Sequence, residues 1–251
     1  MGVQYMCKEE EKGGYSMRFP NAFKGVSKMF AAEILKLIAT GLTVATGVAG
    51  IVSASGVIQS AVNGAEITEE LVANNINVGG VIVAGILGVG AMILYIIAYI
   101  MNLVGLAQAG RDEENFGSAF GLSIAVLVIS IATAVLTGLS IGGNVPENIA
   151  STARTVCEVI VMILVVSGIM NLAERLRDEK MISFGEKVSV LILIFVIAAA
   201  VATFISIFFG RMAWAQHVEG ILDIISGVAL FIGYIIYIIY LAKAKKMLRE
   251  N

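Results

Sequence analysis

The sequence predicts an all-α fold, a polytopic integral membrane helical bundle whose six transmembrane helices form three tandem helical hairpins. Mean hydropathy is +0.91 and only 14% of the residues are charged, whereas a soluble domain carries roughly 25%. A polar turn is repeated along the chain, each time after a long apolar run. Of the 17 Lys and Arg residues, all except Arg154 and Arg211 lie before the first span, in alternate turns or after the last span, which predicts that both termini are cytoplasmic.

The repeated turn shows how the chain is divided. Met-Asn-Leu, Arg-Asp-Glu and Phe-Gly follow one another in residues 101–117 and again in residues 170–185. A partial third copy in residues 237–250 keeps a tyrosine, a leucine, an arginine and an acidic residue in register with residues 99–112. Internal repeats identify the unit from which a fold is built. The predicted unit is a pair of membrane helices followed by a turn.

Residues 1–36 are predicted to be a cytoplasmic N-terminal tail. In its second half the apolar Phe19 and Phe23 share one helical face, and Lys24 and Lys28 share another. This pattern fits an amphipathic helix lying in the membrane interface. It fits equally well the first turns of the first transmembrane helix, and both interpretations stay open.

The membrane domain is predicted to occupy residues 37–242, with hairpins at 37–106, 119–172 and 188–242. Its apolar runs are long enough to cross a hydrocarbon core of about 30 Å. Residues 243–251 are expected to form a basic cytoplasmic C-terminal tail. The sequence leaves open whether the hairpins form a ring or a row.

Small residues recur at four-residue spacing in the first two helices. Gly47 ends the series Ala39, Thr43, Gly47, and Gly88 follows Ala84. Small side chains let helix backbones approach closely within a membrane. Gly47 and Gly88 are therefore predicted to be helix-packing positions, with neighbours on several faces of the first helix.

Hydroxyl side chains supply most of the polar groups within the predicted spans. Residues 119–141 and 188–209 match each other across polar as well as apolar positions. The candidate residues in these two helices are Thr133, Thr137, Thr203 and Ser206. Their hydroxyls either bond to helix carbonyls or line a narrow polar path through the membrane.

Asn102 and Asn171 occupy matching places at the inner ends of two helices. A buried amide of this kind bonds across helices, a contact worth roughly 0.6–2 kcal/mol, or else contacts a ligand. The charged turns 111–114 and 177–180 are interpreted as solvated turns, with a docking point for a cytoplasmic partner or a carboxylate metal site as the alternatives.

Ionisable residues are sparse within the predicted spans. Glu33 and Lys36, spaced to pair on one helical face, are placed near the inner end of the first span, and Glu158 near the outer end of the fourth. Because buried ionisable groups mark proton relays, their absence at mid-depth argues against a proton-driven pump.

Catalytic motifs are also missing from the sequence. His217 is the only histidine; beside Trp214 it suggests interfacial anchoring, and as a lone base it would need a nucleophile such as Ser206 or Cys157. The chain contains no phosphate-binding loop, zinc-protease spacing or nucleophile elbow. We therefore expect no enzyme, no cofactor and no metal site.

The sequence is compatible with two functions. The first is a structural or partner-binding membrane subunit, associated with the lipid bilayer and with copies of itself or another membrane subunit. The alternative is a small transporter or channel with a Thr/Ser-lined path between the hairpins. The net charge of −2 gives no case for nucleic acid.

The layout resembles two groups of proteins. Three two-helix repeats with both termini on one side are similar to the mitochondrial carrier family, but the repeated proline and acidic signature of that family is missing, so no site residues are transferred. The chain also looks like multi-pass proteins of bacterial plasma membranes, which implies a plasma-membrane location.

Overall fold

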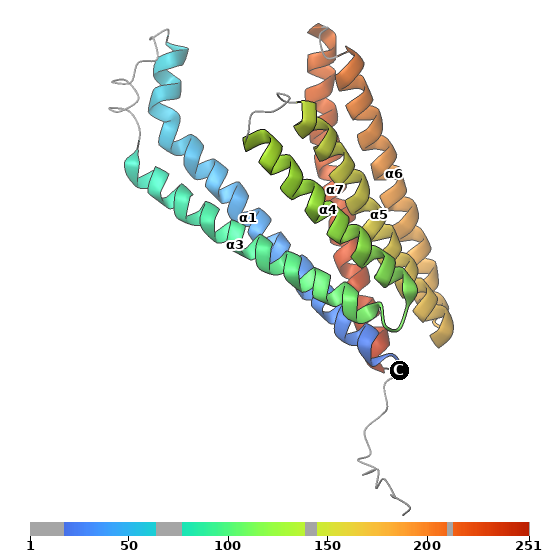
Figure 1. Cartoon of the computed structure of the whole chain (residues 1–251). Helices are drawn as coiled ribbons and strands as arrows, with labels where there is room; N and C mark the ends of the chain where they lie inside the picture. Colours follow the sequence, from blue (N-terminus) through green and yellow to red (C-terminus); the bar gives the residue numbers. More distant parts are fainter. Residues whose placement is uncertain (1–17, 64–76, 139–144, 210–212, 251) are drawn as a thin grey trace, which may run out of the picture.

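The computed structural model describes residues 18–63, 77–138, 145–209 and 213–250. Within these residues the chain is entirely helical, which confirms the predicted all-α class (Figure 1). The six helices are α1 (Pro20–Val62), α3 (Val78–Ala109), α4 (Glu114–Gly138), α5 (Val145–Leu176), α6 (Glu179–Phe209) and α7 (Ala213–Glu250).

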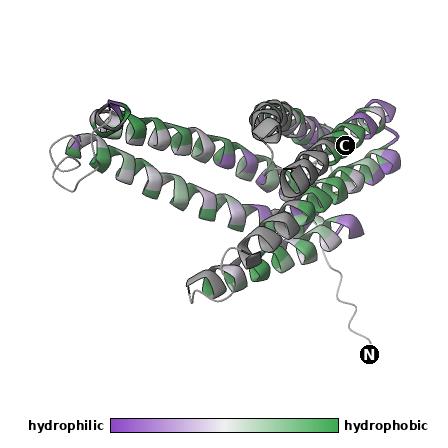
Figure 2. Ribbon diagram, turned by 90° about the horizontal axis from the view of Figure 1, so that it is seen from above, coloured by the Kyte–Doolittle hydropathy of each residue, from purple (hydrophilic) through white to green (hydrophobic). Residues whose placement is uncertain are grey.

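Four segments within these helices are long and apolar enough to cross a membrane. They are Pro20–Gln59, Val78–Ala109, Glu114–Thr133 and Val156–Leu176. Among the residues that Figure 2 colours, hydrophobic ones predominate along the helices. These lengths and compositions identify the chain as a membrane protein.

The helices at both ends of the chain are longer than the predicted spans. α1 is a single helix of 43 residues, so the segment after Phe19 is continuous with the first span. Pro20 is its first residue, a position where the missing N–H of proline costs nothing. Residues 243–250 were expected as a tail but are the last turns of α7, because Ala244, Met247 and Leu248 are buried while their charged neighbours face outwards.

Consecutive helices pack against one another in chain order. α1 contacts α3, α4 contacts α5 and α6 contacts α7; α3 and α4, α5 and α6, and α1 and α7 are also in contact. The α1/α3 hairpin meets the other four helices near the end that carries the C-terminus and diverges from them towards the opposite end (Figure 1).

The close crossing of α1 and α3 depends on two glycines. A Cβ atom on Gly25 would collide with the backbone oxygen of Gly105 and lie only 2.7 Å from the Cβ of Ala109. A Cβ on Gly105 would lie 2.8 Å from the backbone oxygen of Gly25. Only residues without a side chain allow this approach.

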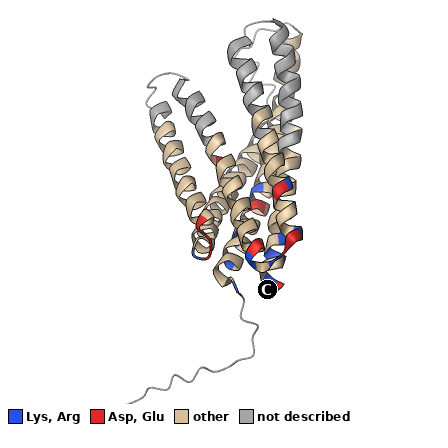
Figure 3. Ribbon diagram, turned by 90° about the vertical axis from the view of Figure 1, so that its right-hand side faces the viewer, with Lys and Arg blue, Asp and Glu red and all other residues tan. Residues whose placement is uncertain are grey.

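The hydrophobic core lies at the end of the bundle where charged residues gather (Figure 3). Side chains from all six helices enter it, and the largest that are fully buried include Phe116, Leu106, Leu172 and Tyr240. Phe184 meets Tyr240 edge to face, with ring centroids 5.5 Å apart. In α1 and α3, by contrast, only 11% of the most apolar window is buried.

Candidate functional site

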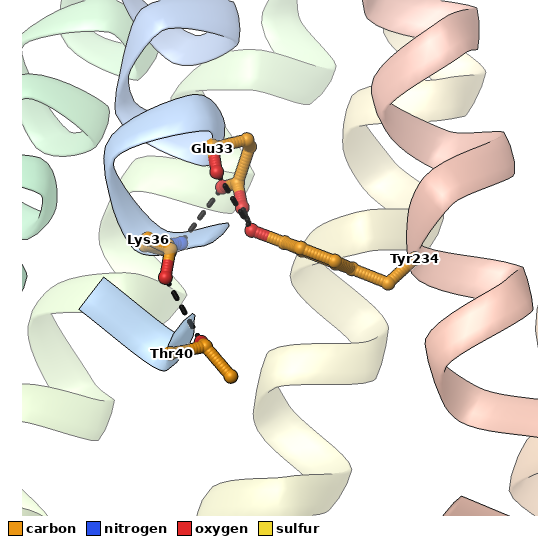
Figure 4. A network of polar contacts seen from close by, with 4 residues as sticks. All are labelled: Glu33, Lys36, Thr40 and Tyr234. Carbon is orange, nitrogen blue, oxygen red and sulfur yellow. Dashed lines mark hydrogen bonds and ion pairs between the residues drawn. The ribbon is translucent and has the colours of Figure 1, made fainter. Parts of the chain in front are cut away.

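A buried carboxylate lies where the α1/α3 hairpin meets α7. Glu33 is only 4% exposed. Its Oε1 atom pairs with Lys36 Nζ at 2.7 Å, which confirms the pair expected from the spacing. Its Oε2 atom accepts a hydrogen bond of 2.7 Å from the hydroxyl of Tyr234, which reaches across from α7 (Figure 4).

The hydroxyl of Tyr234 holds both the side chain and the backbone of Glu33. It lies 3.0 Å from the Glu33 carbonyl oxygen as well as 2.7 Å from the carboxylate. Hydrogen bonds to a charged acceptor are roughly twice as strong as neutral ones. The contact therefore attaches one turn of α1 to α7 through a single side chain.

A second pair of hydroxyls extends this network along α1. Thr40 Oγ1 donates to the carbonyl oxygen of Lys36 at 2.9 Å (Figure 4) and lies 2.7 Å from the hydroxyl of Tyr95 on α3. Tyr237, one turn from Tyr234 on α7, is 4% exposed. Polar groups from three helices thus meet at one level of the bundle.

The contact between Tyr234 and Glu33 lies some distance along α7 from the basic residues at the C-terminal end of that helix. Tyr234 is nine residues before Lys243, the first basic residue of the last cluster, which is about 14 Å along the helix axis. A carboxylate that is buried this far from the end of the bundle is costly unless it is paired. Both carboxylate oxygens of Glu33 have partners. The arrangement joins α1 to α7 through a buried ion pair and a hydrogen bond.

The first charged turn forms a second polar joint. Asp112 Oδ2 accepts from the backbone N–H of Ala22 at 2.7 Å, and Oδ1 accepts from Asn21 Nδ2 at 2.9 Å. This carboxylate therefore caps the N-terminus of α1, although it belongs to the turn between α3 and α4. It lies at the end of the helix where negative charge is favoured.

Glu113, the next residue, connects the same turn to α5. It is 6% exposed, accepts from Asn171 Nδ2 at 2.8 Å and pairs with Arg175 at 2.6 Å. Arg175 also donates to the carbonyl oxygen of Asp112 at 3.3 Å. The interpretation of residues 111–114 as a solvated turn is therefore incomplete, because two of its acids hold neighbouring helices.

The second charged turn has the same motif and a different role. Asp178 Oδ1 accepts from the N–H of Met181 at 3.1 Å, so it caps its own helix, α6. Arg177 adopts φ 59° after the end of α5, and the N–H of Asp178 bonds to the carbonyl oxygen of Ala173 at 2.9 Å. This is a Schellman-type helix end.

The two candidate glycines lie in different surroundings. A Cβ on Gly88 would be 3.7 Å from Thr46 Cγ2, so Gly88 is at the α1/α3 interface. Gly47 is exposed, and a Cβ there would have nothing within 4 Å.

The candidate hydroxyls can be followed only in part. Thr133 Oγ1 donates to the carbonyl oxygen of Ile129 in its own helix at 2.8 Å. The side chains of Thr137, Thr203 and Ser206 lie outside the described part of the structure, as does the neighbourhood of His217.

The two candidate asparagines also differ. Asn171 bonds across helices to Glu113. Asn102 is half-buried, and its side chain has no hydrogen-bond partner among the described residues. No group of three or more His, Cys, Asp or Glu side chains among those residues could hold a metal ion.

The sequence identified the charged residues of these contacts better than it identified the residues that they contact. Glu33 stands between two apolar stretches, a signal that could have identified it as buried. Tyr234 has no comparable signal, because its contact with Glu33 spans 201 residues.

Comparison with known protein families, with characterised proteins and with solved structures gave no match.

Proposed function

We propose that all six helices cross the plasma membrane as three hairpins, with both termini in the cytoplasm, and that the protein is a partner-binding membrane subunit. The distribution of basic residues supports the orientation. The turns that carry these residues lie at the same end of the bundle as the C-terminus (Figure 3). The partner is a membrane-spanning helix of a second copy or of another subunit.

The observation that carries this proposal is the exposure of small residues on the diverging part of α1. Gly41, Ala45 and Gly47 are exposed, and a Cβ on either glycine would have nothing within 4 Å. Small residues give another helix a shallow surface for close packing, with van der Waals contact as the driving force. The α1/α3 hairpin thus presents a helix-packing surface that no other described part of the chain covers.

Cross-linking tests the proposal. Cys7 and Cys157 are first replaced by serine, and single cysteines are then introduced as Gly47→Cys and, for the control, Gly88→Cys. Gly47→Cys should cross-link between chains in native membranes, whereas Gly88→Cys should not, because that position faces α1 of its own chain. The mass of the complex in lipid nanodiscs then distinguishes a homo-oligomer from a stoichiometric partner. A clean monomer with no cross-link at Gly47 would contradict the proposal.

A small transporter or channel is the second candidate, and the Glu33 network favours it. Titratable groups inside a membrane commonly mark ion pathways, and Glu33 lies buried at the contact between α1 and α7. Liposomes containing the protein should then pass protons or small cations, and Glu33→Gln should reduce this flux at least tenfold. Equal flux through the wild type and Glu33→Gln, or no flux in either, would exclude this function.

A further inference from the structure

We infer that a hollow between the start of α6 and the end of α7 binds the headgroup of an anionic phospholipid. The hollow measures about 350 Å³ and is lined by three lysines, two acidic residues and three apolar side chains; the charged ones are Lys180, Lys243, Lys246, Asp178 and Glu250. This volume falls within the range of small-ligand sites, roughly 300–1,000 Å³. Basic pockets between membrane helices on the cytoplasmic side suit phosphate headgroups.

Two of the lysines in the hollow form no ion pair with a protein carboxylate among the described residues. Two acidic residues also line it: Asp178 accepts a hydrogen bond from Met181 N–H, and Glu250 lies 3.9 Å from Lys246, so one of the three lysines is already paired within the hollow. Among the described residues, neither Lys180 nor Lys243 has a carboxylate partner. An anion entering the hollow would therefore meet two lysines that form no ion pair among the described residues, in a hollow whose three lysines outnumber its two carboxylates.

The apolar part of the wall belongs to the hydrophobic core or packs against it. Met181 and Met247 are each 5% exposed and belong to the hydrophobic core. Lys243 Nζ lies 4.3 Å from the centroid of the Phe184 ring, which positions the ammonium group at the wall. The combination of lysines with apolar side chains matches a molecule that has a charged head and a hydrocarbon tail.

An exposed apolar face leads from the hollow into the membrane. Ile239 and Ile232 lie four and eleven residues before Lys243, on the same side of α7, and are 44% and 51% exposed. An acyl chain can follow this face while the phosphate stays beside the lysines. This continuity favours a lipid over a soluble phosphate. The inference requires the proposed membrane placement of α6 and α7, but not the partner-binding role.

Native mass spectrometry of the purified full chain tests the inference. Phosphatidylglycerol and phosphatidylcholine with identical acyl chains are titrated against three proteins: the wild type, a pocket variant and a control variant. The pocket variant combines Lys180→Gln, Lys243→Gln and Lys246→Gln. The control removes three exposed basic residues outside the hollow, as Lys24→Gln, Lys187→Gln and Arg249→Gln.

The wild type and the control should retain one phosphatidylglycerol in preference to phosphatidylcholine. The pocket variant should bind phosphatidylglycerol roughly tenfold to a hundredfold more weakly, since each lysine near an anionic surface contributes about fivefold. If the triple variant does not fold, Lys180→Gln alone serves as the test, because Lys180 is exposed and its replacement leaves the core intact. This single variant should bind phosphatidylglycerol severalfold more weakly.

Equal binding of the two lipids, or equal losses in the pocket and control variants, would overturn the inference. Displacement of phosphatidylglycerol by millimolar glycerol 3-phosphate would overturn it as well, since the site would then take a soluble phosphate. A protein that fails the cross-linking test at Gly47 can still pass this one, so failure of the partner-binding role is distinguishable.

Discussion

Tyr234 on α7 donates its hydroxyl to the buried carboxylate of Glu33 on α1 at 2.7 Å, across 201 residues of sequence. Both ends of this contact belong to helices that the proposed topology places in the membrane. It ties α1, and with it the α1/α3 hairpin, to α7.

Tyr234→Phe should lower the free energy of unfolding by about 1.5–3 kcal/mol, the usual contribution of a hydrogen bond to a charged group. Thermal unfolding in mild detergent measures this change. Tyr95→Phe is the matched control, because it removes a hydroxyl whose bond to Thr40 is exposed. A double variant with Glu33→Gln should lose less than the sum of the two single losses. Equal losses for the two tyrosine variants would contradict the assigned role.

Asp112→Ala should destabilise the protein by about 1–2 kcal/mol, because it removes the cap of α1. Hydrogen exchange should increase in the first turns of α1, although the substitution lies in another part of the sequence. Glu114→Ala is the control, since Glu114 is exposed and its side chain has no hydrogen bond or ion pair among the described residues. Unchanged exchange near Ala22 would show that the cap does not form.

Arg175→Gln should destabilise the protein more than Glu113→Gln. Removing the arginine leaves a carboxylate without its cation on a side chain that is only 5% exposed, whereas removing the carboxylate leaves an arginine whose side chain is 50% exposed and can be hydrated. The difference should be on the order of 1 kcal/mol, reduced by the exposure of Arg175. Chemical unfolding curves of the two variants decide the order, and the reverse order would refute this account.

Gly25→Ala should destabilise the crossing of α1 and α3 by roughly 1–3 kcal/mol, because the added methyl group meets the backbone of α3. Gly41→Ala, on the same helix, should be neutral or slightly stabilising, since a Cβ there has nothing within 4 Å. Unfolding by denaturing detergent compares the two variants. Similar losses at both positions would mean that the close approach is not present in the membrane.

Arg177→Gly should stabilise the protein by about 1 kcal/mol. Arg177 has φ 59°, a left-handed conformation that costs roughly 1–2 kcal/mol for residues with a side chain and little for glycine. Arg111→Gly in the first turn is the comparison, because no positive φ occurs there and the added backbone freedom should only destabilise. A lower melting temperature for Arg177→Gly would contradict the assigned geometry.

The sequence by itself determined the helical class and the approximate positions of the six helices, because both depend on long apolar runs that are local features of the chain. It also located the Glu33–Lys36 pair, since two residues three apart share a helical face. The last turns of α7 were not predicted, because the basic residues after residue 242 were interpreted as a tail. Met247 and Leu248 nevertheless continue the buried face of the helix.

The tertiary structure alone decided what each polar group contacts. Asp112 and Asp178 occupy matching places in the repeated turn, yet one caps α1 and the other caps α6. Asn102 and Asn171 also match, yet only Asn171 meets the buried Glu113. These differences arise from the rotation and crossing of helices far apart in the chain, which bring Tyr234 to Glu33 and leave Gly47 exposed. Helical periodicity orients residues on their own helix but does not specify which helix lies opposite.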